Sequence, residues 1–293
     1  MYGDDSFRKE IVMSSESSNT AIRLDNIIKS YGKHDVLKGV TMQVNKGDIY
    51  GLIGKNGAGK TTIFKMILGL SEYTSGSVSI AGSQNRKELF ANRSKVGFFV
   101  GSNFYGYLSG RANLEYYAAA KGLRGKALNQ EVDRVLKVVG LVDGKEKQKA
   151  KGYSLGMKQR LGIGNAILGN PDILILDEPT NGLDPQGIAD IRHMIRRFRD
   201  EFGMTVIVSS HILGELENTA DRFGIVHNGV IAKEITQDDL SAKRPEVELT
   251  VSADNLERAK SILAENGIDV LKEGKEKVTL EDYYFELIGG SAE

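Results

Sequence analysis

The segment from Gly54 to Thr62 has a spacing suited to binding phosphate. It fits the pattern G-x-x-x-x-G-K-[ST], in which glycines let backbone N–H groups turn toward phosphate oxygens. Lys60 would add a full positive charge beside the β- and γ-phosphates of a nucleotide, and the Thr61 hydroxyl would ligate Mg²⁺. An incidental glycine-rich loop is the alternative, but the apolar strand before the motif and the helix after it favour a phosphate site. The expected phosphate-binding residues are Gly54, Lys55, Asn56, Gly57, Ala58, Gly59, Lys60, Thr61 and Thr62.

Two carboxylates end a second motif, in which the apolar run from Ile173 to Leu176 is followed by Asp177 and Glu178. A buried strand that delivers carboxylates at its end suits the metal and the attacking water of a phosphate site. Asp177 would hold the metal shell, and Glu178 would polarise water for attack on the γ-phosphate. Taken alone, a strand followed by an acidic turn would be the better interpretation. The phosphate-binding pattern upstream favours the catalytic one.

The elements that must position these motifs alternate between strand, turn and helix. Continuous apolar runs at Ile173 to Leu176 and Thr205 to Val208 are typical of parallel strands covered on both faces. Such alternation predicts an α/β sandwich with a parallel core. The other predicted strands are Ala21 to Ile28, Val40 to Val44, Ile49 to Ile53, Ser77 to Ile80, Val96 to Val100 and the hairpin Ile225 to Ala232; the helices are Thr61 to Leu70, a mostly helical stretch from about Ala112 to Gly140, and Pro185 to Phe202.

The two ends of the chain differ in character from the middle. Residues 1–20 are polar and are expected to be disordered. Residues 239–293 read as a small α+β extension without a recognisable catalytic constellation. Within that extension the pattern predicts strands over Glu246 to Ser252, Ile268 to Val270 and Val278 to Leu280, and helices over Asn255 to Glu265 and Glu281 to Ile288.

The composition excludes several classes of protein. Thirty-nine basic residues balance thirty-nine acidic ones, so no bulk charge favours a nucleic-acid partner. There is no cysteine, which rules out disulfides and thiolate metal sites. No apolar run approaches the roughly 20 residues of a membrane-spanning helix. We therefore expect a cytoplasmic chain that reaches a membrane only through a partner.

Four further segments resemble the ATP-binding cassette (ABC) ATPases. Tyr153 to Arg160, just before the second motif, resembles the ABC signature, and Asn181 to Pro185 resembles the D-loop. Ser209-Ser210-His211 resembles the segment that carries the switch histidine. Tyr31 matches the aromatic residue that stacks on adenine. The resemblance extends from about residue 21 to residue 238, and it implies a P-loop NTPase fold of ABC type with an antiparallel β subdomain and a helical subdomain at about 104–160.

This resemblance implies a mechanism that needs two cassettes. In ABC ATPases two cassettes associate head to tail and enclose two ATP molecules, each with Mg²⁺. Ser154 and Gly156 would then contact the γ-phosphate held by the other subunit, at the start of a helix. His211 would contact the same phosphate beside Glu178, and Asp184 would couple the two sites. A homodimer or a pairing with a sister cassette is therefore expected.

The sequence departs from the family pattern at two places, and the second of them resembles one branch of the family. Gly101-Ser102-Asn103 stands where the family usually has a glutamine that contacts Mg²⁺, so Ser102 or Asn103 would have to substitute. The signature has Leu155 and Met157 at positions that are usually glycine and glutamine. This form of the signature resembles the bacitracin and lantibiotic resistance branch of ABC exporters. Thr279 to Leu287 also resembles the chain ending of many export ATPases.

The predicted function is that of an ATP-hydrolysing subunit beneath a separate transmembrane permease. The aromatic-rich region from Phe104 to Tyr117 would receive the permease's cytoplasmic helices, and would hold the chain at the inner face of the plasma membrane. The cargo would be a drug or an antimicrobial peptide. The alternative is a soluble ABC ATPase that acts on ribosomes or DNA, but one cassette without sustained heptads argues against it. A nucleotide sensor without turnover would predict a damaged second motif, whereas Glu178 is present.

Overall fold

The computed structural model describes residues 19–32, 34–101, 104–217, 219–242, 249, 251–268 and 270. The chain divides into two compact units, residues 1–237 and 238–293. The larger unit contains every motif named above except the chain ending. The predictions for residues 1–18, for the strand at Val278 to Leu280 and for the helix at Glu281 to Ile288 lie outside the described residues.

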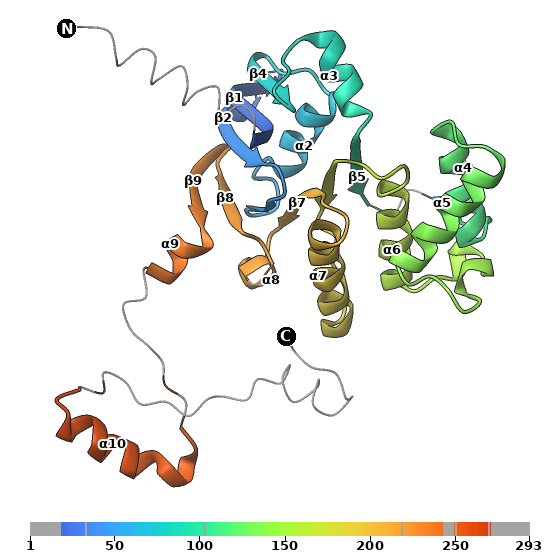
Figure 1. Cartoon of the computed structure of the whole chain (residues 1–293). Coiled ribbons are helices and arrows are strands. Elements are labelled where there is room, and N and C mark those ends of the chain that lie inside the picture. The colour runs from blue at the N-terminus through green and yellow to red at the C-terminus, as the bar shows by residue number, and fades with distance from the viewer. Residues whose placement is uncertain are drawn as a thin grey trace, which may run out of the picture. The chain divides into compact units, whose positions relative to one another are not determined.

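A mostly parallel sheet forms the centre of the larger unit (Figure 1). Its β3 strand is buried along its whole length, as expected for a strand covered on both faces. The β8–β9 pair is antiparallel and forms one edge. In spatial order the six strands are β5 (Val96–Val100), β6 (Ile173–Asp177), β7 (Thr205–Ser210), β3 (Ile49–Ile53), β8 (Arg222–His227) and β9 (Val230–Thr236).

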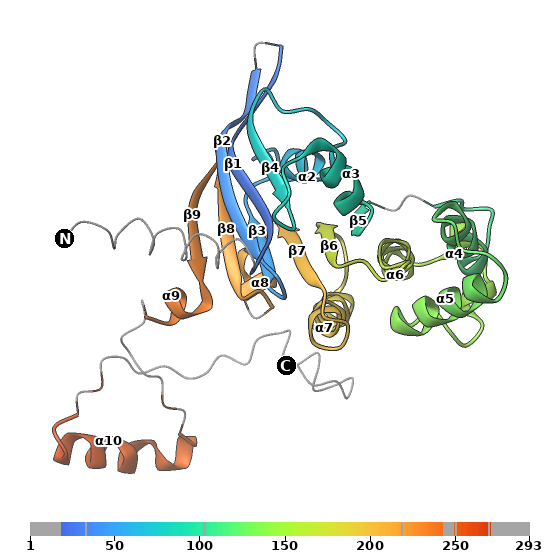
Figure 2. The same cartoon turned by 45° about the horizontal axis from the view of Figure 1, so that its top comes forward.

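An antiparallel sheet of three strands packs beside it, in the order β2-β1-β4 (Figure 2). The β1–β2 pairing extends to Tyr31 opposite His34, so the hairpin closes through Gly32, which has φ 62°. The apolar faces of both sheets meet α2 in one core that includes Ile22, Leu52 and Phe64. The bounds are β1 (Thr20–Tyr31), β2 (His34–Asn45), β4 (Ser75–Ile80) and α2 (Lys60–Leu68).

Three further helices complete this part of the larger unit. The longest, α7 (Pro185–Asp200), is amphipathic; it buries Ile191, Met194, Ile195 and Phe198. Asp184 caps its amino-terminal end by accepting a hydrogen bond from Gly187 N at 3.0 Å. The shorter helices are α3 (Arg86–Arg93) and α8 (Leu213–Glu217).

A helical group lies between β5 and β6 in the sequence. The stretch predicted as mostly helical contains two helices, because Gly122 adopts φ 94° and the chain turns there. Both helices bury apolar residues that include Leu114 and Val135. The bounds are α4 (Gly110–Ala120), α5 (Gly125–Val138) and α6 (Leu155–Ala166). The α/β architecture predicted from the sequence, with its antiparallel sheet and helical part, is confirmed.

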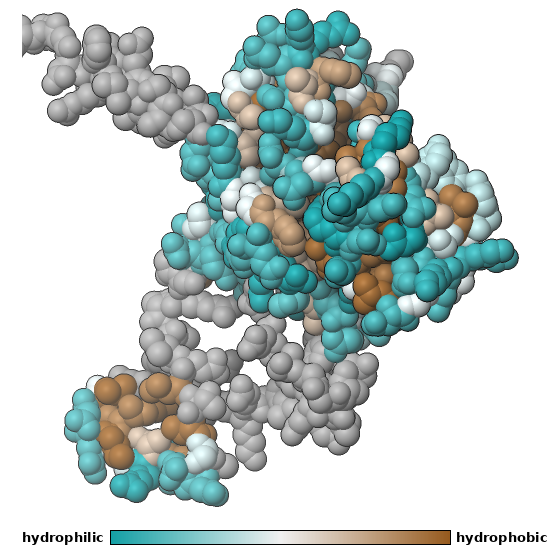
Figure 3. All heavy atoms as spheres, turned by 45° about the vertical axis from the view of Figure 1, so that its right-hand side comes forward, coloured by the Kyte–Doolittle hydropathy of each residue, from teal (hydrophilic) through white to brown (hydrophobic). Residues whose placement is uncertain are grey.

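The smaller unit is described over α10 (Leu256–Glu265), which matches the predicted helix, and a short 3₁₀ turn before it. The α9 helix (Gln237–Ala242) begins at the boundary of the two units. The strands predicted around Leu249 and Ile268 are not found in the described residues of those segments. Figure 3 shows apolar residues gathered on the part that contains α10; the exposed ones are Leu249, Val251, Leu256, Ile262, Ile268 and Val270.

No helix in the described ranges combines the length and the apolar character that crossing a bilayer requires.

Candidate nucleotide site

Three neighbouring strands bring the predicted site residues together at the carboxyl-terminal end of the central sheet. In the order β6-β7-β3 the strands run parallel, so their carboxyl ends lie together. Leu176 pairs with Val208, which places Asp177 beside Ser209, and Ile53 pairs with Ser210. Crevices at the carboxyl ends of parallel strands are the usual ligand sites of α/β folds.

The glycines of the phosphate-binding loop are required by close approaches and by positive φ angles. A Cβ atom on Gly54 would lie 2.6 Å from the carbonyl oxygen of Val226. Gly59 has φ 113°, and a Cβ atom there would lie 2.8 Å from the Leu37 side chain. Gly57 has φ 81°. The loop therefore has the compact backbone that lets N–H groups face an anion at the start of α2.

Replacing Gly54 with Ala is expected to weaken ATP binding at least about tenfold, or about 1.4 kcal/mol. The added methyl group must push the loop away from Val226, which displaces the N–H groups that surround the phosphates. The measurement is the Kd for ATP by calorimetry. Gly152→Ala is the matched control, because a Cβ at Gly152 meets nothing within 4 Å. An unchanged Kd in Gly54→Ala would contradict the assignment of this loop.

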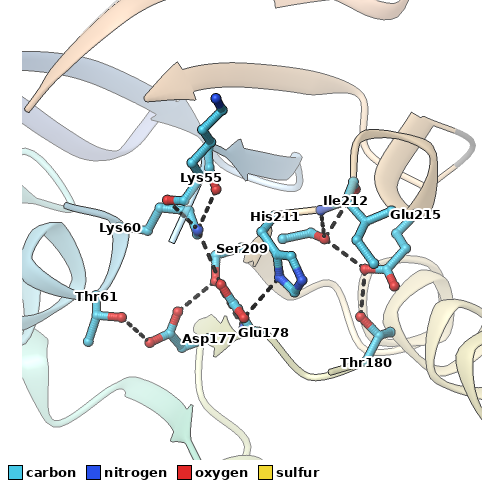
Figure 4. Close-up of polar contacts among 12 residues, drawn as sticks. Lys55, Lys60, Thr61, Asp177, Glu178, Thr180, Ser209, His211, Ile212 and Glu215 are labelled. Atoms are coloured by element: carbon cyan, nitrogen blue, oxygen red, sulfur yellow. Dashed lines mark hydrogen bonds and ion pairs between the residues drawn. The ribbon is translucent and has the colours of Figure 1, made fainter. Parts of the chain in front are cut away.

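Lys60 joins this loop to the second motif (Figure 4). Its side chain is only 5% exposed, and its Nζ atom lies 2.5 Å from Gly54 O and 3.1 Å from Glu178 Oε1. The ammonium group thus lies between the phosphate loop and a carboxylate. A triphosphate in the loop would compete with Glu178 for the same charge.

Asp177 accepts hydrogen bonds from two hydroxyl groups. Thr61 Oγ1 donates to Asp177 Oδ2 at 2.6 Å, and Ser209 Oγ donates to Asp177 Oδ1 at 2.6 Å. A hydroxyl and a carboxylate side by side are hard oxygen ligands of the type that Mg²⁺ prefers, with its other positions filled by phosphate oxygens and water. The donor set therefore fits a Mg²⁺ ion. Sequence reasoning missed Ser209 as a member of this group.

Glu178 has an unusual backbone conformation, with φ 49°. Left-handed conformations of residues other than glycine cost of the order of 1–3 kcal/mol and persist where the surroundings fix them. The Glu178 N–H donates to Ser209 Oγ at 2.9 Å, and its carbonyl oxygen accepts from Asn181 N at 3.2 Å. This turn points the carboxylate at Lys60 on one side and at His211 on the other (Figure 4).

His211 completes the group from the end of β7. Its Nδ1 atom lies 3.1 Å from Glu178 Oε2, and its side chain is 30% exposed. The structure thus brings together Lys60, Thr61, Asp177, Glu178 and His211, as the sequence predicted. Their arrangement can bind phosphate, hold a divalent cation and accept a proton from water.

Ser154, Gly156 and Asp184 lie apart from this group in the described part of the chain. Ser154 caps α6 by accepting from Met157 N at 3.3 Å, and Asp184 caps α7. Gly156 faces the D-loop, since its Cβ would lie 3.8 Å from the Leu183 side chain. In the described ranges no hydrogen bond or ion pair joins these residues to Lys60 or Glu178.

Tyr31 lies at the end of the β1–β2 hairpin, and its ring is available for stacking. The residue is 51% exposed, and Lys29 Nζ lies 4.7 Å from the ring centroid. Its hydroxyl is 3.5 Å from Ser71 Oγ. Gly101, with φ 65°, is described, whereas Ser102 and Asn103 lie outside the described residues.

Comparisons with known proteins agree with this geometry. A family model described as ABC transporter matches residues 37–181. The chain is 38% identical to the bacitracin transport ATP-binding protein BcrA of Bacillus licheniformis, over 93% of this chain and 98% of BcrA. It is 41% identical to the lantibiotic transport ATP-binding protein SrtF of Streptococcus pyogenes, over 73% of this chain and 90% of SrtF.

A solved structure with a similar fold is the post-hydrolysis dimer of the ATP-binding cassette MJ0796 bound to ADP and phosphate. The TM-score is 0.67 at 26% identity, and the match covers 74% of this chain and 98% of that one.

Proposed function

This chain belongs to the ATP-binding, ATP-hydrolysing subunits of ABC transporters, and from that premise we propose that it drives export of an antimicrobial peptide through a separate permease. The observation that carries the proposal is the likeness to a bacitracin transport protein over nearly the full length of both chains. A likeness confined to the nucleotide-binding domain would cover only part of each chain. The soluble alternative on ribosomes or DNA is not favoured, because the relatives are transport proteins.

The site supports a division of roles in ATP hydrolysis. Lys60, already buried against the loop, would bind the β- and γ-phosphates. Glu178 would accept the proton of the attacking water, and His211, 3.1 Å from that carboxylate, would contact the γ-phosphate from the same side. Thr61 and Asp177 would hold Mg²⁺, which neutralises charge on the phosphates.

The predicted residues of the signature and the D-loop would act across a dimer. Ser154 and Gly156 lie at the amino-terminal end of α6, where backbone N–H groups and the helix dipole favour an anion. The side chain of Leu155 between them is 45% exposed. We propose that this end meets the γ-phosphate bound by the partner cassette, that Tyr31 stacks on adenine, and that Asp184 couples the two sites. The dimeric cassette with a similar fold supports this assembly.

A cluster of tyrosines supplies the proposed contact with the permease. Tyr105 has its ring centroid 5.0 Å from that of Tyr116 and 5.7 Å from that of Tyr107. Tyr107 is 68% and Tyr116 is 50% exposed. The hydrogen bond to Tyr116 raises the pKa of Tyr105 to about 12. Amphipathic rings of this kind suit a protein partner, which would hold the chain at the inner face of the plasma membrane.

The export proposal predicts a change in susceptibility. Cells that carry Glu178→Gln on the chromosome should become severalfold more susceptible to bacitracin or a lantibiotic, because a permease without ATP turnover cannot export. The measurement is the minimal inhibitory concentration of each peptide. Glu257→Gln is the matched control, since Glu257 lies exposed on α10 and its side chain contacts only Lys260 there. Unchanged susceptibility in cells whose purified variant has lost ATPase activity would refute the cargo but leave the catalytic site standing.

A further inference from the structure

A buried carboxylate beside the nucleotide site has no part in the roles above. Glu215, on α8, is 7% exposed. Its Oε2 atom accepts two hydrogen bonds, from Thr180 Oγ1 at 2.9 Å and from Ser210 Oγ at 2.7 Å (Figure 4). Within the described part of the chain no lysine, arginine or histidine forms an ion pair with it. Burying a carboxylate without a neighbouring cation costs free energy of folding. We therefore expect Glu215 to have a function that accounts for its burial.

The two hydroxyl donors lie next in sequence to the segments that carry the proposed catalytic residues, one in the loop after β6 and one at the end of β7. Thr180 is two residues beyond Glu178, and Ser210 immediately precedes His211. Ser210 Oγ also accepts a hydrogen bond from Ile212 N at 2.9 Å, which fixes the backbone on the far side of His211. One oxygen of Glu215 therefore ties the loop after β6 to the end of β7, just before His211.

A second tie between the same segments lies on the opposite face of β7. Successive residues of a strand point to opposite faces, and Ser209 and Ser210 use both. Ser209 contacts Asp177 and the Glu178 N–H, whereas Ser210 contacts Glu215. The left-handed turn at Glu178 thus has one hydroxyl at its own N–H and a second anchor just beyond it, at Thr180.

The geometry points to Glu215 as a positioning residue for ATP hydrolysis: we propose that it sets the distance between Glu178 and His211 by holding Thr180 and Ser210. This inference rests on the roles proposed for Glu178 and His211. Among the described residues, no hydrogen bond or ion pair joins Glu215 to Glu178, His211 or the phosphate-binding loop. The effect of Glu215 passes through the backbone of the two segments. A misplacement of about 1 Å at a reacting group lowers rates by about a hundredfold. Loss of the hydrogen bonds to Glu215 would let Glu178 and His211 shift by such an amount, and would therefore have a large effect on turnover.

A merely structural role for Glu215 makes a different prediction. If the carboxylate served only to seat α8, its loss would lower stability and ATP affinity together with activity. A positioning role lowers kcat while the phosphate loop, on β3 and α2, keeps its affinity. The kcat of a variant at position 215 should depend on the number of hydrogen bonds that the side chain accepts and not on its charge, because both donors are neutral hydroxyls.

The test compares kcat, the Kd for ATP and the Tm across four variants of the full chain. Glu215→Met keeps the length and loses the acceptor; we expect kcat to fall about tenfold to a hundredfold, with Kd within about twofold of wild type. Glu215→Gln keeps an acceptor oxygen and should restore kcat to within about threefold. Thr180→Val removes one donor and should lower kcat about fivefold, and the double variant Thr180→Val/Glu215→Met should be no slower than Glu215→Met, since both remove one tie. Glu257→Met, on exposed α10, is the control.

Each outcome decides between the inference and its rival. A wild-type kcat in Glu215→Met overturns the inference, as does a parallel loss of kcat, ATP affinity and Tm. If Glu215→Met does not fold, Thr180→Val decides alone, because valine has the shape of threonine: a wild-type kcat in that variant is then the overturning result. Glu178→Gln in the same series separates the two proposals. If that variant still turns over, the role of Glu178 is wrong; if it is inactive while Glu215→Met is normal, only the inference fails.

Discussion

Glu178→Gln is expected to lower the kcat for ATP hydrolysis by about 10²–10⁴-fold, the usual contribution of a general base. Glutamine keeps the size of the side chain and its contact with His211, but cannot accept a proton. Affinity for ATP should be unchanged or tighter. In the free protein Glu178 Oε1 lies 3.1 Å from Lys60 Nζ, and removing this charge frees the ammonium group for the phosphates.

The same variant should accumulate as an ATP-bound dimer, because in the proposed mechanism ATP binding closes the dimer and hydrolysis reopens it. Steady-state phosphate release and size-exclusion chromatography with and without ATP provide the two readouts. Glu257→Gln is the control for a lost carboxylate. Undiminished hydrolysis would show that another group activates the water. Lost hydrolysis without a dimer would leave Glu178 in place and point to a sister cassette as the partner.

Lys60→Met is expected to abolish measurable turnover and to raise the Kd for ATP about a hundredfold or more. A hydrogen bond to a charged group contributes about 1.5–3 kcal/mol, and Lys60 would donate to two phosphates. Its ammonium group is buried and already directed at the loop, so no neighbouring side chain can take over the contact without rearrangement. Methionine fills the space of the stem and carries no charge.

Thermal unfolding with and without ATP measures this effect. A ligand at a hundred times its Kd stabilises the folded state by about 2.7 kcal/mol, so wild type should show a clear rise in Tm that the variant lacks. Lys65→Met is the matched control, because Lys65 is an exposed lysine on the same helix, α2, and has no part in the site. An equal ATP-induced rise in Lys60→Met would place the phosphates elsewhere.

The parts of the site that sequence could predict are those specified by local patterns. The loop from Gly54 to Thr62 and the pair Asp177-Glu178 each follow a short apolar run, and all of their chemistry lies within a few residues. The likeness to bacitracin and lantibiotic transport proteins was predicted from the signature around Leu155 and is confirmed by the relatives. The strands of the central sheet were predicted well for the same reason, since continuous apolar runs mark buried parallel strands.

Contacts between distant loops could not be predicted. Thr180 and Glu215 are 35 residues apart, and Asp177 and Ser209 are 32 apart. Serine, threonine and glutamate are common surface residues, so nothing local distinguishes the ones that become buried. The strand register supplies the missing information, because Leu176 opposite Val208 places Ser209 beside Asp177.

The α3 helix was not predicted, and the end of β1 was placed too early. The α3 helix buries only Leu89, so its sequence carries no amphipathic pattern. Asn85, which caps it by accepting from Lys87 N at 2.9 Å, was the available signal. The β1 strand continues beyond Ile28 to Tyr31 because it pairs with β2, a tertiary effect that the pattern of one strand does not contain.

The left-handed turn at Glu178 has an evolutionary consequence. Asparagine or glycine adopts such a φ angle at less cost than glutamate, so either residue would relieve strain while removing the carboxylate. Under the role proposed for Glu178, selection for ATP turnover would keep glutamate there. In a duplicated gene released from that selection, the first substitutions tolerated at this position would be those that make the protein more stable and catalytically silent. Loss of activity in such a lineage would start as a gain in stability and would be hard to reverse.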